Sequence, residues 1–121
     1  MLVNLYIKNY ALIEESSVDF ERGFNVISGE TGAGKSIMLG GLSLILGKRA
    51  DVSVLHDSES KCIVEGRFNI DKSAYNSFFQ ENNLDFEAET IIRREITPNG
   101  KSRAFINDTP VNLSVLKSFS E

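Results

Sequence analysis

The segment that decides the fold is Gly29-Glu30-Thr31-Gly32-Ala33-Gly34-Lys35-Ser36. It matches the phosphate-binding-loop pattern G-x-x-x-x-G-K-[ST] at every fixed position. An apolar strand is expected directly before it, over 24–28, and an almost wholly apolar helix directly after it, over 36–46. Strand, glycine-rich turn and helix in this order are the context in which such a loop binds phosphate. The sequence therefore predicts an α/β protein of the P-loop class.

Each residue type in this segment has a physical role in holding phosphates. Glycines let the backbone approach a phosphate closely, successive amide groups form an anion-binding nest, and the following helix adds the positive end of its dipole. We expect Lys35 to reach the β- and γ-phosphates and offset their charge during reaction, and the Ser36 hydroxyl to bind Mg²⁺. The expected nucleotide-binding residues are Gly29, Glu30, Thr31, Gly32, Ala33, Gly34, Lys35 and Ser36.

The flanking sequence predicts an antiparallel sheet beside this strand and helix. Apolar and polar residues alternate over 2–20, which is typical of a pair of strands, and the alternation recurs over 61–69. Two further strands are expected over 89–97 and 101–107, joined by a hairpin at Pro98-Asn99-Gly100.

Two more helices, one loop and one break complete the expected order. Residues 48–60 are polar and predict a surface loop, and a short helix is expected over 72–82, capped by Asp71. Thr109-Pro110 is expected to break the chain, and a helix is expected to begin at Asn112. Three aromatic residues of the 72–82 helix have the spacing of a core-facing stripe: Tyr75, Phe78 and Phe79.

Composition restricts the function further. No run approaches the ~18 apolar residues of a membrane span, and a formal net charge of −4 disfavours stand-alone nucleic-acid binding. The basic pairs Lys48-Arg49 and Arg93-Arg94, with Lys101 and Arg103, are expected to lie on solvated faces. Cys62 is the only cysteine, which excludes an internal disulfide and fits a buried thiol in a reducing cytoplasm.

Phosphoryl transfer also needs an acidic residue for the metal and a group that orients water, and neither is evident in the sequence. The carboxylates Asp57, Asp71 and Asp108 lack the preceding apolar strand that a metal-holding Asp requires, and no Asn-Lys-x-Asp motif for guanine is present. A self-contained small kinase or GTPase is therefore the weaker alternative. A non-enzymatic dimerisation or interaction module is another alternative.

The position of the loop in the chain favours a third class. A pair of strands precedes the loop here, and this order is typical of ABC-type ATPase heads.

The chain resembles the RecN family of bacterial DNA-repair proteins, which is similar to the structural-maintenance-of-chromosomes (SMC) proteins. The resemblance covers the whole chain and rests on these stretches: Ile7-Lys8-Asn9-Tyr10-Ala11-Leu12-Ile13, Phe20-Glu21-Arg22-Gly23, the loop through Ile37, Leu46-Gly47-Lys48-Arg49-Ala50-Asp51, Val64-Glu65-Gly66-Arg67-Phe68, Arg93-Arg94-Glu95-Ile96 and Gly100-Lys101-Ser102-Arg103-Ala104-Phe105-Ile106-Asn107.

This resemblance implies that residues 1–121 are the N-terminal lobe of a split ATPase head, with an antiparallel layer beside the P-loop strand and helix. It implies ATP and Mg²⁺ as cofactors and a role in recombinational repair of double-strand breaks. The partners it implies are the C-terminal half of the same head, a second head in an ATP-dependent dimer, and DNA for the full-length protein, which would be nucleoid-associated. The metal-holding Asp, the catalytic Glu and the signature segment would follow residue 121, so this chain alone is expected to bind ATP but to hydrolyse it poorly.

Several positions depart from the family's pattern or extend the predicted site. Gly40-Gly41 stands where the family usually has Asp-Ala, which suggests close packing or a local compromise, and His56 stands where it usually has Arg. By analogy with the family, Lys8 and Asn9 are expected to lie near the nucleotide. Arg49 is expected to face a phosphate or DNA.

Overall fold

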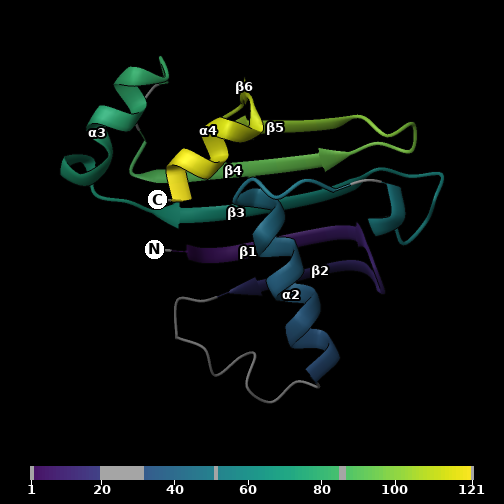
Figure 1. Ribbon diagram of the computed structural model, residues 1–121. Coiled ribbons are helices and arrows are strands. Elements are labelled where there is room, and N and C mark those ends of the chain that lie inside the picture. Colours follow the sequence, from purple (N-terminus) through teal and green to yellow (C-terminus); the bar gives the residue numbers. More distant parts are fainter. Residues whose placement is uncertain (1, 20–31, 51, 85–86, 121) are drawn as a thin grey trace.

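The computed structural model describes residues 2–19, 32–50, 52–84 and 87–120 (Figure 1). The alternating segments form one sheet with the strand order β2-β1-β3-β4-β5-β6, in which every neighbouring pair is antiparallel. This confirms the predicted antiparallel layer, while the strand expected over 24–28 lies outside the described residues. The strands are β1 (Leu2–Tyr10), β2 (Ile13–Asp19), β3 (Cys62–Asn69), β4 (Glu89–Ile96), β5 (Ser102–Ile106) and β6 (Thr109–Val111).

The predicted break at Thr109-Pro110 is wrong, because these residues belong to β6. Pro110 pairs with Phe105 of β5, and β6 is the last strand of the sheet. Proline has no amide hydrogen to donate, but an edge strand needs hydrogen bonds on one side only. The tight turn that leads into β6 contains Asn107 and Asp108, both with positive φ (49° and 69°), a conformation that Asn and Asp tolerate better than most residues.

Two helices cover one face of the sheet. The helix α2 (Gly32–Ile45) crosses in front of β1 and β3, and α4 (Leu113–Ser120) lies over the neighbouring strands, as Figure 1 shows. α2 begins four residues before the predicted start at 36, because the apolar pattern begins only there, whereas helical hydrogen bonding does not require apolar side chains. Among the described helices, none is long and apolar enough to cross a membrane.

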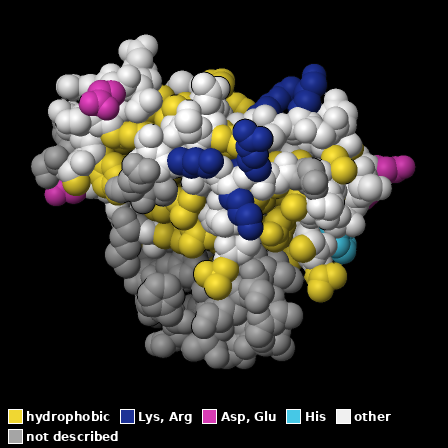
Figure 2. Space-filling view, in the orientation of Figure 1, with side chains coloured by type: hydrophobic (Ala, Val, Ile, Leu, Met, Phe, Trp, Pro, Cys, Tyr) yellow, Lys and Arg dark blue, Asp and Glu magenta, His cyan; other side chains and the backbone are white. Residues whose placement is uncertain are grey.

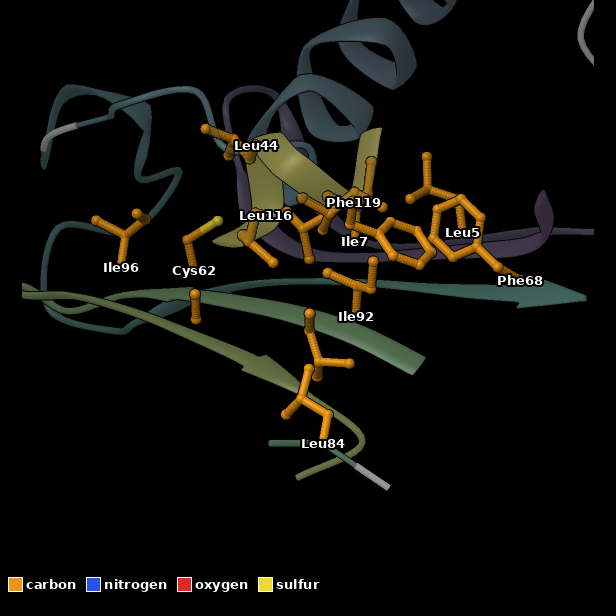
Figure 3. Packing of buried hydrophobic residues seen from close by; sticks show 14 of the residues in the cluster. Leu5, Ile7, Leu44, Cys62, Phe68, Leu84, Ile92, Ile96, Leu116 and Phe119 are labelled. Carbon is orange, nitrogen blue, oxygen red and sulfur yellow. The ribbon is translucent and has the colours of Figure 1, made fainter. Parts of the chain in front are cut away.

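The core lies between these two helices and the sheet (Figure 3). Alternate residues of the strands point into it, as the period of two predicts. Cys62 is fully buried among them, as predicted. The residues that the core draws from the strands and from both helices include Leu5, Ile7, Leu44, Ile45, Cys62, Val64, Ile92, Ile96, Leu116 and Phe119.

The helix α3 (Lys72–Glu81) closes one end of this core with its aromatic residues, and their predicted core role is confirmed. Phe79 is buried, and the ring of Tyr75 stacks on Phe119 of α4 at a centroid distance of 5.1 Å. Phe78 meets Phe119 edge-on at 5.5 Å. Offset and edge-to-face pairs of this kind stabilise beyond their buried area, so α3 and α4 are held together.

The Gly40-Gly41 pair lies where α2 comes closest to β1. A Cβ atom at Gly40 would collide with the hydroxyl of Tyr10, and one at Gly41 would lie 2.6 Å from Cδ1 of Ile7. Of the two explanations that the sequence left open, close backbone packing is therefore the correct one. An Asp-Ala pair at these positions would not fit against Tyr10 and Ile7 without movement.

Candidate nucleotide-binding site

The predicted phosphate-binding residues divide between described and undescribed positions. Gly29, Glu30 and Thr31 lie outside the described residues, and Gly32 to Ser36 form the backbone of the first turns of α2. The side chains of 32–37 also lie outside the description. The first four amide groups of a helix have no partner within the helix, and the described first turn of α2 contains no acidic residue that would offset its positive end. This end of α2 is therefore suited to an anion.

The opposite end of α2 is held by Arg94 of β4, which is only 1% exposed. Its Nη1 donates hydrogen bonds to the carbonyl oxygens of Leu44 (2.8 Å) and Lys48 (2.6 Å), and its Nε donates one to Oγ of Ser102 (2.9 Å). A buried cation at the carbonyl end of a helix complements the negative end of the helix dipole. Arg94 therefore links α2, β4 and β5.

Burial affects the ionisation of Arg94 and of the neighbouring Cys62. Desolvation lowers the pKa of the Arg94 guanidinium, and a negative charge on Cys62 would act in the opposite direction. Desolvation raises the pKa of the Cys62 thiol to about 11, against an opposing effect of Arg94. Both side chains lie on the core face of the sheet, so the expectation that Arg94 is solvated is wrong.

Asn9 anchors the loop that follows α2. Its side chain is 5% exposed, and its Nδ2 donates to the carbonyl oxygens of Asp57 (3.0 Å) and Ser60 (2.9 Å). Its backbone has a φ of 56°, a left-handed conformation that Asn tolerates. Nδ1 of His56 lies 2.9 Å from the carbonyl oxygen of Ala11, which accepts a hydrogen bond from that nitrogen. These contacts fix the loop to the end of β1.

Lys8 and Arg49 lie away from the first turn of α2. Lys8 is exposed on β1 between buried neighbours, so it lies on the sheet face that α2 does not cover. Arg49 is exposed beyond the C-terminal end of α2, and this helix of 14 residues is about 21 Å long. Arg49 therefore lies at the opposite end of α2 from Lys35, and the contact of Lys8 and Asn9 with a nucleotide stays a prediction.

Arg49 and Lys48 line a pocket of about 260 Å³ between the end of α2 and β1. Tyr10 and Ser43 also line it, and burial raises the pKa of Tyr10. Figure 2 shows Lys and Arg side chains gathered near the middle of this face of the molecule. Lys117 of α4 packs beside Gly47, next to this basic pair.

The remaining candidate carboxylates have local structural roles. Oδ1 of Asp57 accepts a hydrogen bond from the Glu59 amide (3.0 Å), Asp71 precedes α3, and Asp108 lies in the turn before β6. Within the described ranges, no group of three or more His, Cys, Asp or Glu side chains could hold a metal ion.

Comparisons with known proteins agree with this geometry. The chain is 42% identical over 122 residues to the DNA repair protein RecN of Vibrio cholerae and 40% identical over 119 residues to that of Bacillus subtilis. These matches cover 100% and 97% of the chain, which spans about a fifth of each relative's length (22% and 21%). A solved structure from a study of ATP-driven dimerisation and DNA-stimulated activation of SMC ATPases superposes with a TM-score of 0.71 at 22% identity. That superposition covers 97% of this chain and 75% of the other.

The chain has the fold of SMC-type head domains, with α2 opening on glycine residues. The chain belongs to the AAA domain family, whose model matches residues 4–120. The resemblance to RecN proteins that the sequence predicted is also confirmed over the whole chain.

Proposed function

We propose that the chain binds ATP with Mg²⁺ at the N-terminal end of α2, as the ATP-binding lobe of a RecN-like ATPase. The observation that supports this most is that the G-x-x-x-x-G-K-S segment opens the helix that crosses the sheet of an SMC-type head. Free amide groups and the helix dipole at this end favour a triphosphate. Lys35 would contact the β- and γ-phosphates, and Ser36 would bind Mg²⁺.

Each nucleotide-binding residue keeps a distinct role in this proposal. Amide groups of 29–36 would surround the phosphates, and Mg²⁺, when bound, would offset charge between the β- and γ-phosphates. Neither Lys35 nor Ser36 can serve as the base that orients the attacking water. We therefore assign substrate binding and charge compensation to this lobe, and efficient hydrolysis to a head completed by further residues.

The wider role follows from the relatives. We propose that residues 1–121 form one lobe of a split head that pairs with a C-terminal lobe of the same protein and, with ATP, with a second head. The complete protein would act in the bacterial cytoplasm, at the nucleoid, in recombinational repair of double-strand breaks. Its curated relatives are named as DNA repair proteins, which supports this role. Arg49, exposed beside Lys48, is the proposed phosphate or DNA contact of this lobe.

Thermal unfolding with and without Mg-ATP tests the nucleotide site. A ligand at 100 times its dissociation constant stabilises a fold by about 2.7 kcal/mol, which raises the midpoint of a small domain by several degrees. We expect this shift with ATP, a smaller one with GTP, and none for Lys35→Ala. Lys101→Ala, which alters an exposed lysine in the β4–β5 hairpin, is the matched control and should keep the full shift. An equal shift in Lys35→Ala would contradict the proposal.

A further inference from the structure

We propose that Arg94 is the positioning residue of the nucleotide site. Its buried guanidinium fixes the C-terminal end of α2 to the sheet, and through the helix it sets where the N-terminal end of α2 meets the phosphates. This inference rests on the proposed function, because it concerns the same site.

The hydrogen bonds of Arg94 join three elements through one side chain. Nη1 lies 2.8 Å from the carbonyl oxygen of Leu44 and 2.6 Å from that of Lys48, the last turn of α2 and the residues after it. Nε lies 2.9 Å from Oγ of Ser102 on the neighbouring strand. Two of these bonds reach carbonyl oxygens four residues apart, so they restrict the position of the helix end.

Burial of the Arg94 charge carries a desolvation penalty. Its side chain is 1% exposed, and Nη2 has no hydrogen-bond partner among the described residues. A buried charge that is only partly satisfied contributes little net stability. Charge-assisted hydrogen bonds with fixed directions do, however, select one geometry over its alternatives. This balance points to positioning rather than to stability as the role of Arg94.

The helix can transmit this constraint to the phosphate site. Gly40 and Gly41 rest directly on Tyr10 and Ile7, which fixes the distance between α2 and β1 near the middle of the helix. Arg94 fixes the last turn at Leu44, about 5 Å further along at a rise of 1.5 Å per residue. A helix held at two points is aligned along its length, and small misplacements at a binding site are costly.

The test compares Arg94→Met with Arg93→Met. Arg93 is the adjacent residue of the same strand but lies on the opposite face, paired with Glu95 at 2.7 Å. The measurements are the Kd for Mg-ATP by calorimetric titration, hydrogen exchange at amides 46–48, and the urea midpoint. We expect Arg94→Met to raise the Kd on the order of tenfold, because a small misplacement of the phosphate-binding end of α2 weakens binding. It should also speed exchange at 46–48, whereas Arg93→Met should change the Kd by less than about twofold.

Two further variants keep the test decisive. Arg94→Lys retains the charge without the planar fork and should restore part of the affinity that Arg94→Met loses. If Arg94→Met does not fold, Ser102→Ala removes only the acceptor of Nε and should raise the Kd about two- to threefold with little change in the urea midpoint.

The outcomes separate the two proposals. If the parent protein does not bind Mg-ATP, the proposed function fails. If the parent binds but a folded Arg94→Met, or Ser102→Ala in its place, keeps the parental Kd, the positioning role alone is overturned.

Discussion

Cys62 carries the only thiol of the chain and lies fully buried on the core face of β3. A thiolate at this place would lose its hydration, so burial favours the neutral thiol and raises its pKa to about 11. The neighbouring Arg94 opposes this shift without cancelling it. The thiol is therefore protonated, and poorly reactive, across the physiological pH range.

This shift predicts a loss of stability at alkaline pH. The pKa is higher in the folded protein than in the unfolded chain, so the contribution of Cys62 is complete below about pH 9 and is lost as pH rises toward 11. We expect the free energy of unfolding to fall by about 2–3 kcal/mol over this interval. The measurement is urea unfolding at a series of pH values, with Cys62→Ala as the control. Parallel pH profiles for the two proteins would contradict the prediction, because the tyrosines titrate in both.

Residue chemistry near α2 was only partly predictable. The pattern of β4 places Thr90, Ile92, Arg94 and Ile96 on one face, so the period of two indicates that Arg94 points into the core. This alternation is easily missed when Arg93 and Arg94 are treated as one basic pair because they are adjacent in the sequence. The role of Asn9 could not be inferred at all, because its hydrogen-bond partners lie about 50 residues away in the sequence.

At the scale of elements, the contact between α2 and β1 depends on the absence of two side chains. Glycine inside a helix ordinarily costs about 1 kcal/mol relative to alanine. Here Gly40 and Gly41 allow the helix backbone to rest on Tyr10 and Ile7, which no larger residue would permit without movement. The two glycines therefore lower the intrinsic stability of the helix but allow it to lie close to the sheet.

Gly41→Ala is accordingly expected to destabilise the protein, although alanine favours helices. The new Cβ would lie 2.6 Å from Cδ1 of Ile7, a fully buried residue, and overpacking of this kind costs about 1–3 kcal/mol. We expect a net loss of about 1 kcal/mol in urea unfolding. In a double-mutant cycle, Ile7→Val removes the colliding methyl group and should recover about 1 kcal/mol relative to the sum of the single changes. Additive effects would show that the two residues do not meet as described.

The existence of nearly all described elements was predictable, but some boundaries and one strand were not. Alternation over long segments such as 61–69 is a strong local signal. The three residues of β6 have no pattern of their own, and only pairing with β5 makes Pro110 part of a strand. The start of α2 at Gly32 was likewise hidden, because glycine disfavours helices on local grounds.

At the scale of the whole molecule, the sheet has two different faces. α2 and α4 cover one face with the core, while the other carries polar pairs such as Arg67 with Glu89 (3.4 Å) and Tyr6 with Glu15 (2.6 Å). The glycine contact and the hydrogen bonds of Arg94 both hold α2 on the covered face, and the proposed nucleotide site lies at the N-terminal end of the same helix. The position of α2 on this face thus connects the core to the proposed phosphate site.

This arrangement predicts binding of ATP without efficient turnover by the 121-residue chain. The sequence shows no acidic residue that directly follows an apolar strand, so the group that orients the attacking water has no candidate. We expect phosphate release close to the background of Lys35→Ala under saturating Mg-ATP. Turnover that depends on Lys35 and reaches the ordinary enzymatic range of about 1 s⁻¹ or more would contradict this prediction.

Hydrogen exchange with and without saturating Mg-ATP tests most directly where the nucleotide binds. Amides that hold phosphates should exchange more slowly when ATP is bound, so we predict protection at residues 29–36, with no change at 102–111. The protection should disappear in Lys35→Ala and persist in Lys101→Ala. Protection confined to the pocket beside Tyr10 and Arg49, with none at 29–36, would contradict the assignment of the nucleotide site to the N-terminal end of α2.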